Sequence, residues 1–135
     1  MMKNTLAHAL ALLGLSFAGC TTVQYTTTFN GVKVDNGRTP IATVEIENSG
    51  WFLFSFIPIA SGNPDNPDGY GCKLFRNTVK LENNFKVLDR KAREAGADSV
   101  ANLTSHWTDE SAFIILLKRR ACHTSAVLLK PEDCK

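Results

Sequence analysis

The sequence of 135 residues lacks the short motifs that identify many enzymes and metal proteins. It contains no glycine-flanked nucleophile serine, no glycine-rich loop that could cradle a phosphate, and no dinucleotide fingerprint. No two cysteines are separated by two residues, the spacing on which structural zinc sites are usually built. The formal net charge is only +2, which gives no electrostatic reason to expect nucleic-acid binding. We therefore expect no catalytic activity, no cofactor and no nucleic-acid partner.

The sequence also lacks an apolar run long enough to span a membrane comfortably as a helix. Its run Leu6–Leu15 is almost entirely Ala and Leu, with Lys3 before it and the small pair Ala18-Gly19 after it. No acidic residue occurs in the first 34 positions, and the run has no amphipathic face of the kind that a buried helix carries. This layout is typical of a secretory signal peptide. We expect residues 1–19 to be that signal peptide.

The signal-like segment ends in a cysteine. The stretch Phe17-Ala18-Gly19-Cys20 resembles the lipobox of bacterial lipoproteins. The resemblance implies cleavage before Cys20, a lipid on its thiol and acylation of its new amino group. Each buried methylene of these chains stabilises membrane attachment by about 0.8 kcal/mol. Thr21 follows in place of Asp, which in lipoproteins of enteric type implies sorting to the outer membrane, with the domain facing the periplasm.

Three cysteines would remain after the anchor, namely Cys72, Cys122 and Cys134. Outside the cytoplasm the default expectation is a disulfide, and the odd number leaves one thiol free or paired with another molecule. Two alternatives stay open. The cysteines are unpaired core thiols, or Cys122 joins His123 and His106 in a metal or small-ligand site.

The pattern of apolar residues predicts a single small domain over residues 41–135, after a lipidated segment 20–40 that is either a tether or an edge strand. Thr43–Glu47 alternates as a half-buried strand does, and Asn48-Ser49-Gly50 then reads as a turn. A helix follows, capped by Asn77 or Thr78 and ended by Gly96, with apolar residues on one face. That apolar stripe consists of Leu81, Phe85, Leu88, Ala92 and Ala95. The order of elements favours the α+β class, with one amphipathic helix packed on a mainly antiparallel sheet of four to five strands.

Three strands are expected after the helix, within Ala97–Trp107, Ala112–Leu117 and Thr124–Leu129. If they form a meander, the last strand brings Cys134 back toward Cys72. That arrangement favours a Cys72–Cys134 disulfide, because bridged Cα atoms lie about 5.5 Å apart. Cys122 would then be the free thiol.

The most apolar stretch of the mature chain is Trp51–Ile59, with the sequence WFLFSFIPI. As a strand it would be apolar on both faces and would end near Pro58, which cannot donate to a ladder. Alternatively it is an exposed segment that contacts a partner or the lipid surface. The candidate contact residues are Trp51, Phe52, Phe54 and Phe56.

A second resemblance covers Lys91–Leu103, with the sequence KAREAGADSVANL. The pattern is similar to the helix-to-strand passage of small bacterial envelope domains. These include the stress-sensor lipoproteins of the Rcs phosphorelay and the putative heavy-metal-binding domain family. The Rcs sensors have two disulfides, which three cysteines cannot supply within one chain. The resemblance implies a small α+β envelope domain. We therefore expect a lipid-anchored envelope protein with an interaction, structural or stress-sensing role, or alternatively a metal- or small-ligand-binding lipoprotein.

Overall fold

The structure is a computed structural model, and the residues it describes are 20–28, 38–69, 71–111 and 116–130. The expected signal peptide, residues 1–19, lies outside the described residues, as does Cys134. The described residues confirm the α+β class, with one helix and a mainly antiparallel sheet.

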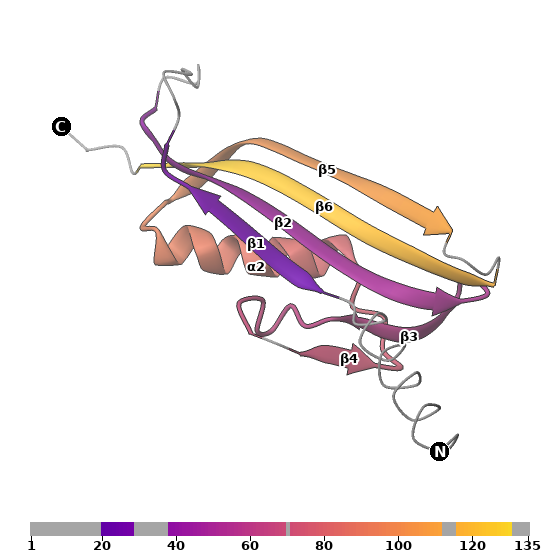
Figure 1. Cartoon of the computed structure of the whole chain (residues 1–135). Helices are drawn as coiled ribbons and strands as arrows, with labels where there is room; N and C mark the ends of the chain where they lie inside the picture. Colours follow the sequence, from indigo (N-terminus) through magenta and orange to yellow (C-terminus); the bar gives the residue numbers. More distant parts are fainter. Residues whose placement is uncertain (1–19, 29–37, 70, 112–115, 131–135) are drawn as a thin grey trace, which may run out of the picture.

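Within the described residues the sheet has six strands, where four to five were expected. Its order is β4-β3-β2-β6-β5, with β1 also paired to β2 (Figure 1). Every strand pairing is antiparallel. Two strands account for the difference: β1 lies in the segment 20–40, for which a tether and an edge strand were both left open, and β4 lies where no strand was expected. The strands are β1 Thr21–Thr26, β2 Pro40–Leu53, β3 Ile57–Gly62, β4 Cys72–Leu74, β5 Ser99–Ser111 and β6 Leu117–Leu129.

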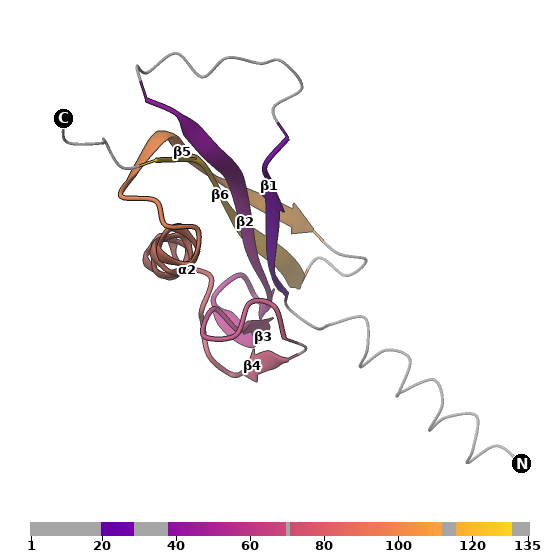
Figure 2. The ribbon, with the colours of Figure 1, turned by 90° about the vertical axis from the view of Figure 1, so that its left-hand side faces the viewer.

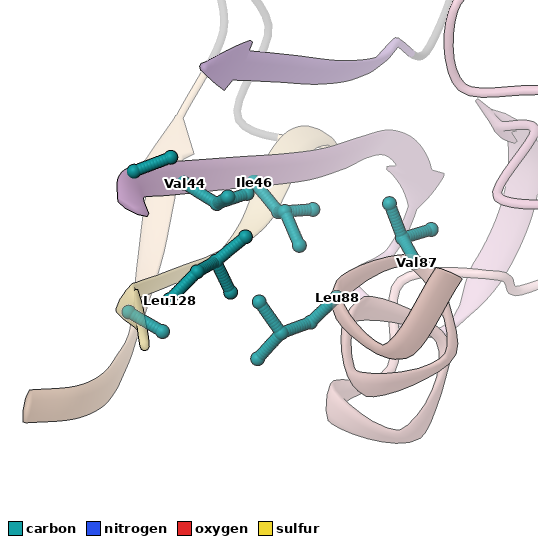
Figure 3. Close-up of a cluster of buried hydrophobic side chains, with 7 residues drawn as sticks. Val44, Ile46, Val87, Leu88 and Leu128 are labelled. Carbon is teal, nitrogen blue, oxygen red and sulfur yellow. The ribbon is translucent and has the colours of Figure 1, made fainter. Parts of the chain in front are cut away.

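The helix, α2 (Leu81–Glu94), lies against one face of the sheet, over β2 and β6 (Figure 2). The core between them is built from Val87 and Leu88 of the helix, Val44 and Ile46 of β2, and Leu128 of β6 (Figure 3). Four of these side chains have no exposed surface and Leu88 has 6%. Burial of aliphatic side chains of this size stabilises a fold by roughly 1.5–3 kcal/mol each.

The two ends of α2 differ in how well the sequence predicted them. Gly96 ends the helix as expected: its φ is +70°, its N–H bonds to the Arg93 carbonyl, and the N–H of Ala97 bonds to the Ala92 carbonyl. These two bonds form a Schellman motif. The expected capping by Asn77 or Thr78 is wrong, because the N-cap residue is Lys80 and no side chain caps it.

The apolar stripe expected on α2 is buried only in part. Leu88 is buried, but Phe85 keeps 40% of its surface exposed. The buried helix face instead includes Asn84, whose Nδ2 donates to the Cys122 carbonyl at 2.9 Å and to Thr124 Oγ1 at 3.1 Å. The helix face that meets the sheet is therefore rotated from the expected stripe so that it includes Asn84. The buried amide of Asn84 forms hydrogen bonds with polar groups of β6 there.

The turn expected at Asn48-Ser49-Gly50 is wrong, because β2 runs straight through it. The Asn48 amide is buried, accepting from Thr21 Oγ1 at 3.0 Å and donating to the Thr78 carbonyl at 2.5 Å. A Cβ at Gly50 would lie 2.9 Å from Ser61 Cβ, so this glycine permits close packing and does not mark a turn.

The WFLFSFIPI stretch is a hairpin connection and not a single core strand. β2 ends at Leu53, the chain turns over Phe54–Phe56, and β3 begins at Ile57. Phe52 is buried, which fits the core reading, whereas Phe54 is 49% exposed. Each of the two readings therefore holds for part of the segment: its start packs in the core as a strand, and its turn is exposed.

The expected meander after the helix is also wrong. Within the described residues the chain forms one hairpin of two long strands, and β6 continues through the region expected to connect the second and third strands. Residues 112–115, part of the expected middle strand, lie outside the description. The topological reason for a Cys72–Cys134 bridge therefore no longer holds, and the bridge itself stays a prediction because Cys134 is not described.

Candidate functional site

Cys20 is fixed to the edge of the folded domain by its own backbone. Its carbonyl accepts the N–H of Ser49 at 2.8 Å, and its N–H donates to Ser49 Oγ at 3.3 Å. β1 begins at the next residue, so the segment described at positions 20–26 is an edge strand and not a tether. The residue Cys20 is exposed. Its thiol is therefore held next to the sheet with access to the surroundings.

The start of β1 is packed tightly against β3. Thr21 is buried, and a Cβ added at Gly62 would lie 2.2 Å from Thr21 Oγ1 and 2.6 Å from the carbonyl carbon of Cys20. Only glycine allows this approach without displacement of the chain. The position of Cys20 thus depends on a glycine 42 residues away in the sequence, a relation that no local pattern signals.

The other described cysteines lie in different environments. Cys72 is exposed at the start of β4, opposite Gly62 of β3. Cys122 is buried beside Phe52 and Val79, and this burial raises the pKa of its thiol above the usual range. Cys20, Cys72 and Cys122 are free thiols in the part of the chain that the structure describes.

The structure brings the two candidate histidines together and separates them from the cysteine. The rings of His106 and His123 stack across β5 and β6 with centroids 4.6 Å apart, and Thr108 Oγ1 lies 3.1 Å from His123 Nε2. Cys122 faces the helix, and neighbouring residues of a strand point to opposite faces. Among the described residues, no group of three or more His, Cys, Asp or Glu side chains is arranged to hold a metal ion.

The open face of the sheet carries an ion-paired row. Arg119 Nη2 lies 2.5 Å from Glu47 Oε1, and Arg119 Nη1 lies 3.4 Å from Glu110 Oε2. On the helix side, Arg120 Nε donates to Asp109 Oδ1 at 2.8 Å and its guanidinium lies over the Phe52 ring. This hydrogen bond holds the pKa of Asp109 below its usual range. Sequence reasoning missed these pairs, because their carboxylates lie on other strands.

The candidate contact residues of the aromatic segment divide by burial. Phe52 is buried and Trp51 is half-buried, whereas Phe54 is 49% and Phe56 is 73% exposed. Other exposed apolar residues belong to backbone segments at the same end of the sheet, where β2 ends and β6 begins, at the right in Figure 1. We call this surface the apolar end, and its members are Phe54, Phe56, Ile57, Leu74, Phe75 and Leu116.

A hollow of about 390 Å³ lies between β1 and the C-terminal part of α2. Lys91 Nζ in this hollow pairs with Asp68 at 2.8 Å and with Glu94 at 3.1 Å. The hydrogen bond to Asp68 raises the pKa of Lys91. The charged groups that line the hollow are therefore engaged with one another.

No helix among the described residues has the length and apolar character required to cross a membrane. Comparison of the chain with models of protein families, with curated proteins and with solved structures found no match.

Proposed function

We propose that this chain is a lipid-anchored bacterial envelope protein. Its anchor is Cys20, its membrane is the outer membrane, and its domain faces the periplasm. The domain has no catalytic role and serves as an interaction, structural or stress-sensing module. Support comes from the signal-like residues 1–19 and from the lipobox-like stretch that ends at Cys20.

The position of Cys20 is the structural observation that carries the proposal. Its residue is exposed and immediately precedes the first strand, so a lipid on Sγ can extend away without displacing core side chains. Acylation of the amino group leaves an amide with one N–H. The hydrogen bond from that nitrogen to Ser49 Oγ is therefore compatible with the modified residue.

In the same proposal α2 is an amphipathic helix. Val87 and Leu88 pack on the sheet, whereas Glu82 and Lys86 form an exposed ion pair on the outer surface at 2.7 Å. A helix of this kind stabilises the domain through its packing face and needs no ligand.

The alternative function, a metal- or small-ligand-binding lipoprotein, has less support. It would use Cys122, His123 and His106, but Cys122 lies on the helix-covered face and the stacked histidines lie on the other. Because these three side chains do not converge, we do not propose a metal site.

Intact mass spectrometry tests the anchor. The protein is extracted from bacterial membranes, and free thiols are alkylated without reductant. We expect a mass that begins at Cys20 and carries acyl chains, and we expect the matched variant Cys72→Ser to keep that acylation. The variant Cys20→Ser should retain residues 1–19 and carry no lipid. A wild-type chain of full length with an alkylated Cys20 would show that the proposal is wrong.

A further inference from the structure

The apolar end gathers exposed side chains from three separate parts of the chain. The β2–β3 connection supplies Phe54 and Phe56, Phe75 directly follows β4, and Leu116 precedes β6. The Phe54 N–H bonds to the Leu116 carbonyl at 2.7 Å, and the Phe75 N–H bonds to the Ile59 carbonyl at 3.1 Å. These bonds place the backbones of the three segments side by side at one end of the sheet, where the rings of Phe54 and Phe56 also stack with centroids 6.4 Å apart.

The exposure of this surface is large for aromatic residues. Phe56 is 73% exposed and Phe75 is 76% exposed, and Leu74 beside it is 60% exposed. Single exposed apolar residues are ordinary, but a contiguous group marks an interaction surface.

The backbone at this end adopts conformations that bulky residues seldom take. Phe54 has a φ of 51°, Ser55 a φ of 70° and Phe75 a φ of 53°. Non-glycine residues with positive φ carry a conformational cost, and in exposed turns glycine or asparagine usually occupies such positions. Strained backbone that presents phenylalanine to the outside points to a function for those side chains.

The segments that form the apolar end contain no acidic residue, and Lys73 beside Leu74 pairs with the more distant Asp65 at 3.4 Å. Residues 48–64, 69–81 and 111–131 contain no Asp or Glu. Arg76 directly follows Phe75, and Lys118 pairs with Phe52 across β2 and β6. An apolar surface bordered by Arg and Lys complements the interface of a membrane that contains anionic lipids.

The anchor lies toward the same end of β2. Cys20 bonds to Ser49, which is four residues from the end of the strand at Leu53. At about 3.3 Å per residue this separation is roughly 13 Å along the strand. A lipid on Cys20 would therefore keep the apolar end close to the bilayer, and the two contacts would reinforce each other.

We propose that the apolar end inserts into the interface of a bilayer that contains anionic lipids. The contact orients the domain with the β2–β3 connection toward the membrane and with the far end of β2, near Pro40, away from it. The inference rests on the proposed function for its cellular setting. Phe54, Phe56 and Phe75 make the apolar contact, and Arg76 and Lys118 face the headgroups.

The test measures how close each position lies to the acyl chains. The acylated protein is purified from membranes and reconstituted into vesicles of phosphatidylethanolamine and phosphatidylglycerol with bromine in the acyl chains. Phe56→Trp and Phe75→Trp place a fluorophore at the apolar end, and Tyr25→Trp is the matched control. Tyr25 is 47% exposed but pairs with Val44, nine residues or about 30 Å from Leu53.

We expect bromine to quench the added fluorescence at positions 56 and 75 at least twofold more than at position 25. Equal quenching at the three positions would overturn the proposal. Weak quenching in vesicles combined with shielding from acrylamide in native membranes would also overturn it, because a protein partner would then cover this end. Quenching at position 56 that is undiminished in phosphatidylcholine alone would overturn the role of Arg76 and Lys118.

A separate variant distinguishes failure of this inference from failure of the anchor. The full chain with Cys20→Ser and Phe56→Trp cannot be lipidated at that position and keeps the apolar residues 1–19, which hold it at the vesicle. We expect quenching at position 56 to persist in this chain. Its loss here, with acylation of the wild type intact, would overturn the membrane contact and leave the lipid anchor standing.

Discussion

Two cysteines of one small domain are expected to behave differently because of where their side chains lie. Cys72 is exposed at the start of an edge strand. Cys122 has no exposed surface, and its burial among apolar groups disfavours the thiolate. The thiolate is the form that reacts with alkylating reagents and binds metals, so burial acts against both.

After mild reduction of any bridge between Cys72 and Cys134, we expect iodoacetamide at about pH 8, near the reference thiol pKa, to label Cys72 in the folded protein. It should label Cys122 only after unfolding in denaturant. The burial of Cys122 and its raised pKa both act against reaction of this thiol in the folded protein. Peptide mass spectrometry of native and unfolded samples measures the two labelling levels. Equal labelling of both cysteines in the native state would contradict the burial of Cys122.

At the scale of single elements, the placement of β1 depends on Gly62. We expect Gly62→Ala to lower the free energy of unfolding by about 1–3 kcal/mol, the usual cost of overpacking. The added Cβ would meet Thr21 Oγ1 at 2.2 Å and Asn48 Oδ1 at 2.6 Å. Urea unfolding measures the effect. Gly71→Ala is the control, because nothing lies within 4 Å of its Cβ; equal costs for both variants would contradict the contact between β1 and β3.

The β5–β6 hairpin carries an ion pair whose contribution depends on pH. Arg120 lowers the pKa of Asp109 in the folded protein, so the pair stabilises the fold above the ordinary aspartate pKa of about 3.9. This contribution disappears as pH falls through the lower folded pKa. The Asp109 side chain is 51% exposed, so a contribution of about 0.2–1 kcal/mol is expected.

Urea unfolding of Asp109→Asn checks this expectation. The variant should be less stable than wild type at about pH 7. The two proteins should be equally stable at a pH well below the ordinary aspartate pKa, where the Asp109 carboxyl is protonated in both the folded and the unfolded state. Glu110→Gln, with a longer contact of 3.4 Å to Arg119, should show a smaller difference at neutral pH. A difference for Asp109→Asn that is the same at both pH values would exclude an ionic origin.

The elements also show which features of the fold can be predicted from sequence. The prediction that Gly96 ends the helix is confirmed. It could be made from the sequence because a Schellman motif is formed by residues close together in the chain. Asn48-Ser49-Gly50 was misread as a turn, because what decides its conformation is packing against Thr21, Ser61 and Thr78, which are distant in sequence. Structure that depends on neighbouring residues can be predicted from the sequence, whereas close packing between strands that are distant in sequence cannot.

The same distinction applies to the candidate sites. Cys20 is predicted as a lipid anchor because the signal-like segment and the lipobox-like stretch are contiguous in the sequence. The sequence predicted only part of the apolar end, namely Phe54 and Phe56. Phe75 is brought to the same end by a hydrogen bond from its N–H to the Ile59 carbonyl, which no spacing in the sequence indicates. Trp51 and Phe52 were named with them and are half-buried and buried.

For the whole molecule, we expect the apolar end to orient the domain at the membrane and not to stabilise the fold. Phe56 and Phe75 are 73% and 76% exposed, so the double variant Phe56→Ser, Phe75→Ser should change the free energy of unfolding by no more than about 0.5 kcal/mol. The matched variant Phe52→Ala removes a ring that is 1% exposed and should cost about 3–5 kcal/mol. Urea unfolding of the protein in detergent, away from any bilayer, measures both. A large loss of unfolding free energy in the double variant would mean that these rings stabilise the fold. A contact with the membrane would then not be needed to account for them. Unchanged stability would leave two aromatic side chains that the folded domain itself does not require.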